Sequence, residues 1–414
     1  MPAIIRQKRY TVGRNMVYKS LFVLGRQPAI GRAELESLFG SAHVAVAGEN
    51  AVLSDLAPAN IPFERLGGTV KLARVVTTIA KNDWRTLQAE LTRAALQLAE
   101  DTLEGKIQLG LSMYGIHTSP RQLVAAGLEI KKHLRGRGYS VRLVPNKEQA
   151  LSSAQVLHNH LTEERGIELL AASAGNKVII ARSTRVQDIN AYAARDQNRP
   201  KRDAFVGMLP PKLAQTIVNL ATAAAAPNED TVVLDPFCGT GVVLQEALLM
   251  GYGGYGTDLE PRMIDFSRQN LEWLATRDRV ASPRLEVGDA TSYHWHSPFA
   301  TVASETYLGH PLGSWPSNSA LQQIIGTCNV IIEKHLRNLA TQAPRGLRAC
   351  LAVPAWRDPN GKLHHLPLLD HLDDMGYNRV SFEHARWQEM VYFRPDQLVA
   401  RELLVIVRNE HVTR

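Results

Sequence analysis

The 414-residue sequence contains only three cysteines, Cys238, Cys328 and Cys350, and they lie far apart. They have neither the paired spacing of a zinc site nor the density of a disulfide framework. The histidine pairs also lack a third ligand at metal spacing, so no metal is predicted; these pairs are His294 with His296 and His364 with His365. So few cysteines are typical of a protein from the reducing cytoplasm.

Long apolar runs are absent as well. No stretch of about 18 consecutive apolar residues occurs, so no segment is expected to span a membrane. The opening residues, MPAIIRQKRY, are basic and lack the apolar core of about 7–15 residues that a secretory signal carries. We therefore expect a cytoplasmic protein that does not contact a membrane.

Excess positive charge is confined to the first half of the chain. Residues 1–206 contain 29 lysines and arginines against 18 acidic residues, a balance of +11, whereas residues 207–414 contain 18 against 22, a balance of −4. This asymmetry suggests that the first half binds a polyanion and the second half carries out chemistry. A solvated basic surface with no partner is the alternative that charge leaves open.

The second half is organised around Val232–Gly241, which reads VVLDPFCGTG. Its apolar residues predict a buried parallel strand that ends at Asp235, and Gly239 and Gly241 predict a tight turn before a helix over 242–250. The three glycines of the dinucleotide fingerprint are missing. A carboxylate at the strand end would repel a pyrophosphate and suits a ligand with a cationic end, such as S-adenosylmethionine. Pro236 and Phe237 belong to the same predicted cofactor site.

Two further acids follow predicted strands. Asp258 ends a short strand 23 residues after Asp235, where a carboxylate usually binds ribose hydroxyls. Asp289, followed by Ala290, ends a strand predicted over 284–289 and could accept a hydrogen bond from an adenine amino group. The alternative is that each acid only caps the following helix or turn.

A basic cluster marks a candidate RNA-binding site in the first half. A helix predicted over 123–136 and the strand after it carry Lys131, Lys132, Arg135, Arg137 and Arg142. Cations at a helix C-terminus are partly explained by the helix dipole, but this density exceeds that need. Binding of RNA phosphates and a plain solvated face both remain open.

The chain divides into five predicted parts: a basic tail (1–17), an α+β segment (18–65), a region of alternating helices and strands (66–183), a polar linker (184–206) and a final domain (207–414). The final domain is predicted to be a doubly wound α/β sheet of the methyltransferase type with a terminal antiparallel hairpin. Near its end we expect a helix over 366–375 and strands over 380–384 and 387–393.

Three stretches closely resemble the THUMP-containing tRNA guanosine-N2 methyltransferases: RPKRDAFVGMLPPKLAQ (199–215), DPFCGTG (235–241) and YFRPDQLVARE (392–402). The resemblance covers most of residues 18–410 and is strongest from 199 onward. It implies a ferredoxin-like segment over 18–65, a THUMP RNA-binding domain over 66–183 and a Rossmann-like domain that binds S-adenosylmethionine. The implied substrate is tRNA, with methylation of guanosine N2 at position 10. Whether a small activating protein is needed is left open.

One departure from this family concerns the predicted catalytic residues. The fourth strand usually ends in Asp-Pro-Pro-Tyr, but here the matching residues are Ser304, Glu305, Thr306 and Tyr307. The resemblance implies that Glu305 takes the role of the aspartate toward the amine and that Tyr307 stacks on a flipped base. Alternatively the motif has decayed and the protein binds tRNA without catalysis, or another RNA or DNA base amine is the acceptor.

Two arginines in the last stretch have an ordinary explanation. Arg394 and Arg401 could contact tRNA, but ion pairs with Asp396 and Glu402 are the default expectation.

Overall fold

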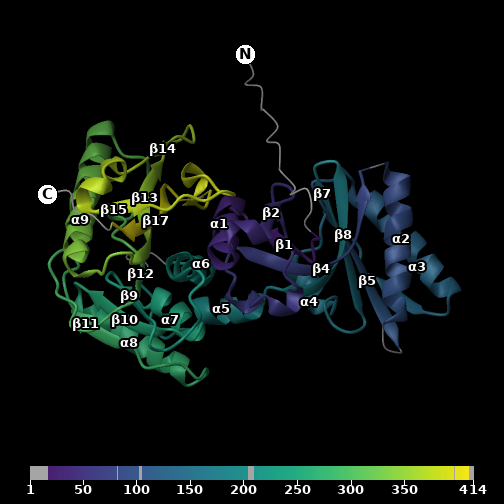
Figure 1. Ribbon diagram of the computed structural model, residues 1–414, viewed down its shortest axis with the longest axis horizontal. Helices are drawn as coiled ribbons and strands as arrows, with labels where there is room; N and C mark the ends of the chain where they lie inside the picture. The colour runs from purple at the N-terminus through teal and green to yellow at the C-terminus, as the bar shows by residue number, and fades with distance from the viewer. Residues whose placement is uncertain (1–16, 82, 102–104, 204–208, 396, 410–414) are drawn as a thin grey trace, which may run out of the picture. The chain divides into compact units, whose positions relative to one another are not determined.

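The computed structural model describes residues 17–81, 83–101, 105–203, 209–395 and 397–409, and it contains two compact units (Figure 1). The first unit holds the described residues up to Arg32, Phe39–Glu64 and Thr69–Asn190. The second holds Ala33–Leu38, Arg65–Gly68 and the described residues from Ala191 onward. The predicted basic tail lies outside the described residues except for Val17.

The first unit is built on one eight-stranded sheet of order β2-β3-β1-β4-β8-β7-β5-β6. Its strands are β1 (Ser20–Leu24), β2 (Val44–Val46), β3 (Ala51–Ser54), β4 (Thr69–Ala80), β5 (Lys106–Tyr114), β6 (Ser140–Leu143), β7 (Gly166–Ala174) and β8 (Lys177–Val186). Because β1 pairs with both β3 and β4, with Leu21 opposite Leu53 and Ala73, the predicted segments 18–65 and 66–183 share this sheet.

Two amphipathic helices, α2 (Trp84–Glu100) and α3 (Pro120–Gly136), pack on this sheet and lie side by side in Figure 1. Their starts are defined by caps: the Asp83 side chain accepts from the Thr86 N–H, and Ser119 forms a capping box with Gln122. Buried apolar side chains of both helices join those of β5 and β7 in one core. A short helix, α4 (Ser153–His158), follows β6.

A buried ion pair crosses the middle of this sheet. The Lys71 ammonium on β4 lies 2.5 Å from the Glu168 carboxylate on β7 and also donates to the Leu151 carbonyl at 2.8 Å. The Ser112 and Ser183 hydroxyls donate to the same carboxylate. A buried charge pair is tolerated only when its remaining hydrogen-bonding capacity is filled, and here two hydroxyls and a carbonyl fill it.

The predicted linker, residues 184–206, is more structured than expected. Its first residues complete β8, and helix α5 (Ile189–Gln197) occupies its centre. Within the second unit the Tyr192 hydroxyl donates to the Gln215 side chain at 2.5 Å, and Arg195 pairs with buried Glu246 at 2.9 Å. These polar contacts explain why a stretch with few apolar residues is nevertheless ordered.

The second unit is a nine-stranded sheet with the main order β11-β10-β9-β12-β13-β17-β15. Its strands are β9 (Val232–Asp235), β10 (Gly253–Asp258), β11 (Arg284–Val287), β12 (Thr301–Glu305), β13 (Arg348–Arg357), β14 (Leu363–His364), β15 (Tyr377–Arg379), β16 (Val391–Tyr392) and β17 (Val399–Arg408). Strands β9 to β13 pair in parallel, and β17 is antiparallel to both β13 and β15. The predicted doubly wound sheet with an antiparallel end is therefore confirmed.

Helices cover both faces of this sheet. Helix α9 (Asn318–Gln342) packs its apolar side chains against β9, β12, β13 and β17. Helices α7 (Val242–Leu249) and α8 (Pro261–Ala275) share a second core with Cys238 and Leu285. Helix α6 (Pro211–Thr222) is almost wholly buried, and its Asn219 donates to Glu34, in the part of α1 (Pro28–Phe39) that belongs to this unit.

Three C-terminal predictions are wrong in detail. The helix expected over 366–375 is two short 3₁₀ turns, Pro367–Asp370 and Asp373–Met375, broken between them at His371 and Leu372. The strand expected over 380–384 is instead β15, a few residues earlier, and the one expected over 387–393 shrinks to β16 after a 3₁₀ turn. Short apolar runs fit several structures, and pairing with β17 selects among them.

Among the helices in the described part of the chain, none combines the length and the apolar character that crossing a membrane requires.

Candidate active site

The glycine turn after β9 sets the geometry of the site. Gly239 and Gly241 have φ of +52° and +83°, a region that favours glycine, and Gly241 is the residue from which α7 starts. The turn is tied to β10, because the Cys238 N–H donates to the Thr257 carbonyl at 2.9 Å. The turn therefore brings backbone close to the end of β9, as the sequence predicted.

The Asp235 carboxylate is buried at the end of β9. It accepts hydrogen bonds from the Ser304 hydroxyl at 2.6 Å and from the Phe237 N–H at 3.3 Å. Burial raises the pKa of Asp235 to about 7, and the nearby charges of Asp258 and Glu305 act in the same direction. A cationic group bound beside this carboxylate would lower the pKa of Asp235 again and would itself be stabilised by the negative charge.

The other two predicted acids do cap the local backbone. Asp258 accepts from the Gly239 N–H at 2.9 Å and the Glu260 N–H at 3.0 Å, and burial raises its pKa. Asp289, two residues beyond the end of β11, accepts from the Thr291 N–H and hydroxyl. Capping and ligand binding are compatible, because both side chains also line the cavity described next.

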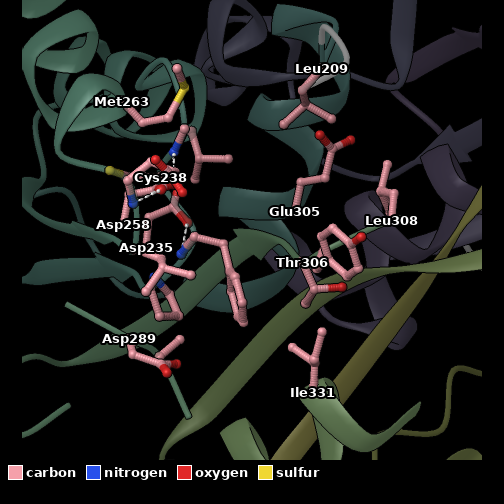
Figure 2. A pocket seen from close by; sticks show the side chains of 18 of the residues that line it. Leu209, Asp235, Cys238, Asp258, Met263, Asp289, Glu305, Thr306, Leu308 and Ile331 are labelled. Atoms are coloured by element: carbon pink, nitrogen blue, oxygen red, sulfur yellow. Dashed lines mark hydrogen bonds between the residues drawn. The ribbon is translucent and has the colours of Figure 1, made fainter. Parts of the chain in front are cut away.

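A cavity of about 620 Å³ opens at the carboxyl ends of the parallel strands. Its lining consists of residues 235–240, 242–243, 258–260, 263, 289–291, 305–311, 330–331 and 334, together with Leu209. Figure 2 shows Asp235, Asp258 and Asp289 along one side of the cavity, with Glu305 and Thr306 on the other. Crevices at this edge of α/β sheets are where ligands bind.

The residues predicted to be catalytic occupy the far side of this cavity, at the end of β12. Ser304 is the exception, because it is fully buried and points its hydroxyl at Asp235. The Thr306 N–H and hydroxyl donate to the Ala352 carbonyl at 3.0 and 3.2 Å and fix the turn. Tyr307 lies edge-on to His310, with ring centroids 6.3 Å apart.

Glu305 forms an ion pair that the sequence did not reveal. Its carboxylate accepts from the Arg401 Nε at 2.5 Å, and both side chains are largely buried. Burial raises the pKa of Glu305, and Arg401 opposes that rise. Glu402, one of the two acids expected to pair with Arg394 and Arg401, is therefore not the partner of Arg401 and faces Arg379 and His365 instead. The other expected acid, Asp396, lies outside the described residues.

Several lining residues were missed. Val330, Ile331 and Lys334 come from the middle of α9, where their spacing predicts only an ordinary amphipathic helix. Beside them the buried His335 ring lies edge-on to the Phe237 ring, with the ring centroids 5.0 Å apart. Burial lowers the pKa of His335 to about 4. The signal in the sequence for this wall was its position after the predicted catalytic residues.

Further candidates lie outside this cavity. Lys132, Arg135, Arg137 and Arg142 are exposed in the first unit, and Lys131 is half-buried. Glu129 lies 3.9 Å from Lys132 and offsets part of the charge. In the part of the chain that the structure describes, no three histidine, cysteine or acidic side chains gather as a metal site would require.

The comparisons with known proteins agree with this architecture. A family model described as a DNA methylase matches residues 138–269, fewer than a third of the chain. The tRNA (guanine(10)-N2)-dimethyltransferase of Pyrococcus abyssi is 42% identical over 104 residues, which cover 24% of this chain and 29% of that protein. The enzyme of the same name from Methanothermobacter thermautotrophicus is 41% identical over 85 residues, covering 20% and 24%.

Two solved structures resemble almost the whole chain. They are TrmN from Thermus thermophilus, with 18% identity, a TM-score of 0.52 and coverage of 94% and 99%, and a possible methylase from Clostridium difficile 630, with 11% identity, a TM-score of 0.53 and coverage of 96% and 100%. These likenesses show a shared fold. The curated relatives match over less than a third of their own length, so their activity carries over only as a proposal.

Proposed function

We propose that this chain is an S-adenosylmethionine-dependent methyltransferase that acts on the N2 amine of a guanosine in tRNA, at position 10. One observation carries the proposal: a single cavity joins three strand-end aspartates to the Glu305–Tyr307 turn. The named relatives are tRNA (guanine(10)-N2)-dimethyltransferases, and they support the choice of acceptor.

The cofactor half of the cavity fits S-adenosylmethionine. Asp235, whose pKa is raised by burial to about 7, suits a cationic amino group that restores its charge. The glycine turn admits close approach of a ligand to the backbone. Asp258 is proposed to bind the ribose hydroxyls, and Asp289 and Ala290 the adenine. When bound, S-adenosylmethionine supplies an electrophilic methyl group.

The acceptor half orients the amine. Glu305 accepts a hydrogen bond from the exocyclic amine and takes up its proton, which becomes acidic as the nitrogen is alkylated. Tyr307 is proposed to stack on the base, and Thr306 keeps the turn in place through the Ala352 carbonyl. Ser304 lies behind the cavity, and its hydroxyl donates a hydrogen bond that orients the Asp235 carboxylate.

The first unit is proposed to dock the tRNA. Its predicted ferredoxin-like and THUMP regions would present Lys131, Lys132, Arg135, Arg137 and Arg142 to the phosphate backbone. The exposed positions of four of these cations support this role. A cytoplasmic location follows from the substrate. An activating protein partner is left as an open part of the proposal.

A second candidate is methylation of a base amine in DNA. The match to a DNA methylase family model favours it. That match runs from residue 138, in the first unit, to residue 269, so it includes Asp235 and Asp258 but ends before the acceptor residues 304–307.

The deciding experiment is transfer of labelled methyl from S-adenosylmethionine to unmodified bulk tRNA and, in parallel, to double-stranded DNA, with nucleoside analysis of the products. Labelled N2-methylguanosine from tRNA is the expected result. Label in DNA alone would establish the second candidate. No label in either, with S-adenosylmethionine still bound, would contradict methylation of either acceptor by this chain acting alone.

A further inference from the structure

The carboxylate of Glu305 is held rigidly at the acceptor end of the cavity. It sits at the last residue of β12, and the guanidinium that binds it comes from β17, two strands away across β13. The Arg401 side chain is 6% exposed and the Glu305 side chain 13%, so packing restricts the rotamers that each can adopt. The carboxylate therefore presents a fixed acceptor to whatever base enters beside it.

The three base amines differ in what lies next to them. Guanine offers N1–H and N2–H side by side, whereas the amine of adenine lies beside the acceptor N1 and that of cytosine beside the acceptor N3. An ionised carboxylate only accepts hydrogen bonds. It can receive both donors of guanine, but beside adenine or cytosine one of its oxygens would face a lone pair.

We propose that Glu305, held in its ion pair with Arg401, reads the adjacent N1–H and N2–H donors of guanine and thereby selects guanine as the methyl acceptor. The inference rests on the proposed function and names the group that decides its base specificity. Arg401 is a positioning residue in this scheme, because it acts on the base only through Glu305.

The buried serine of the acceptor stretch cannot serve in place of Glu305. The Ser304 hydroxyl donates to Asp235 at 2.6 Å and is fully buried behind the cavity. The carboxylate of this stretch belongs instead to Glu305, the next residue along the chain, which lines the cavity. The hydrogen bond from the Arg401 guanidinium holds the Glu305 carboxylate in a defined orientation.

Other charged groups also face this carboxylate. The charge of Glu305 contributes to the raised pKa of Asp235, from β9, and Asp258, Lys334 and His310 line the same cavity. Arg401 is the one cation described in direct contact with Glu305. Its removal would leave the effect of burial on the pKa of Glu305 unopposed, so the acidic limb of the pH–rate profile should move to higher pH.

The first test replaces Glu305 by glutamine in the full chain. A glutamine side chain offers one acceptor and one donor, which matches adenine and mismatches guanine. Labelled methyl is transferred to unmodified bulk tRNA, and guanosine and adenosine products are separated. Glu305→Gln should lower the ratio of guanosine to adenosine product about tenfold or more. An unchanged ratio would overturn the inference.

The second test separates positioning from stability. Arg401→Met should lower kcat, shift the acidic limb to higher pH and reduce the preference for guanine, and Arg401→Lys should restore part of each. The matched control is Arg379→Met, which removes an arginine from the neighbouring carboxylate, Glu402. If Arg379→Met moved the pH limb and the base preference as much as Arg401→Met, the effect would be structural and the assignment wrong.

A binding measurement keeps this inference distinct from the proposed function. Affinities are compared, in the presence of S-adenosylhomocysteine, for short oligouridylates carrying one guanine or one 2-aminopurine, which retains the amine but lacks N1–H. The wild-type chain should favour guanine about tenfold, and Glu305→Gln should not. If the wild-type chain preferred guanine but transferred no methyl group, only the proposed function would be contradicted. Equal wild-type affinities for the two oligonucleotides would contradict the selection of guanine by Glu305.

Discussion

Ser304 donates a 2.6 Å hydrogen bond to Asp235 and so links the end of β12 to the end of β9. The two residues are 69 positions apart in the sequence and adjacent in the site. The bond opposes the effect of burial on Asp235, whose pKa nevertheless rises to about 7. Ser304 therefore acts on Asp235, on the side of the cavity proposed to bind the cofactor, and this has measurable consequences.

Affinity for S-adenosylmethionine should depend on pH through Asp235. The carboxylate binds the cationic amino group only when it is ionised, so the affinity should fall as the pH drops below about 7. Calorimetric titration between about pH 5.5 and 8.5 would measure this, with proton release on binding near pH 7. Asp235→Asn should bind weakly at every pH in this range, and a pH-independent wild-type affinity would contradict the assignment.

The same residue makes stability depend on pH in the opposite direction. The pKa of Asp235 is raised on folding from an ordinary value near 4, so the ligand-free chain should lose stability as the pH rises from about 4 to about 7. Added S-adenosylmethionine should therefore raise the melting temperature more at pH 8 than at pH 6. Ser304→Ala removes a hydrogen bond that lowers the pKa of Asp235. The variant should therefore move the pH dependence of cofactor affinity and that of stability to higher pH.

Asp258→Ala should weaken S-adenosylmethionine binding by about tenfold or more and leave tRNA binding unchanged. The carboxylate is proposed to bind ribose, and it also holds the Gly239 N–H of the turn at 2.9 Å. Asp258→Asn keeps an acceptor for that N–H and should lose less affinity. Filter binding with tRNA and calorimetry with the cofactor would measure the two separately. Equal loss of both affinities would refute the proposed division of labour between the units.

Local patterns predicted the strand, the glycine turn and the strand-end acids on one side of the cavity. The run VVLD, the glycines and the acid at the end of the next strand lie within about 25 residues, where chain geometry dictates their arrangement. Asp235, Gly239 and Asp258 accordingly lie where the pattern indicated. The sheet topology could also be predicted, because alternating strands and helices leave few ways to build a parallel sheet.

The acceptor half depended on contacts between distant parts of the chain. Glu305 and Arg401 are 96 residues apart, and only the antiparallel placement of β17 beside β13 brings them together. On β17 successive side chains point to opposite faces, which is why Arg401 reaches Glu305 while Glu402 faces Arg379. Sequence proximity to Glu402 was therefore a poor guide to the partner of Arg401.

The basic cluster should contribute to tRNA affinity in a salt-dependent way. Replacing Arg135, Arg137 and Arg142 together by glutamine should weaken tRNA binding at low salt and reduce the slope of log affinity against log salt by about one for each phosphate that is no longer neutralised. Cofactor affinity should not change. Arg93→Gln is the control, because that exposed arginine on α2 is paired with Glu90. An unaltered salt slope in the triple variant would show that the cluster is only a solvated face.

The buried pair of the first unit should be far more sensitive to single than to double substitution. Lys71→Met leaves the Glu168 carboxylate buried without its cation and should destabilise the first unit by about 3–5 kcal/mol. The double variant Lys71→Met with Glu168→Leu removes both charges and should recover much of that loss. Hydrogen–deuterium exchange of β4, β7 and β8 in the full chain reports on this sheet specifically.

An exposed pair provides the comparison for this measurement. Arg93→Met breaks the ion pair between Glu90 and Arg93 on α2, whose arginine side chain is 74% exposed, and should change stability by no more than about 0.5 kcal/mol. Solvent replaces a surface partner once it is removed, whereas Glu168 is buried beside Lys71 and solvent does not reach it. If the double variant were as unstable as Lys71→Met alone, the loss would come from packing around the lysine stem rather than from the uncompensated carboxylate.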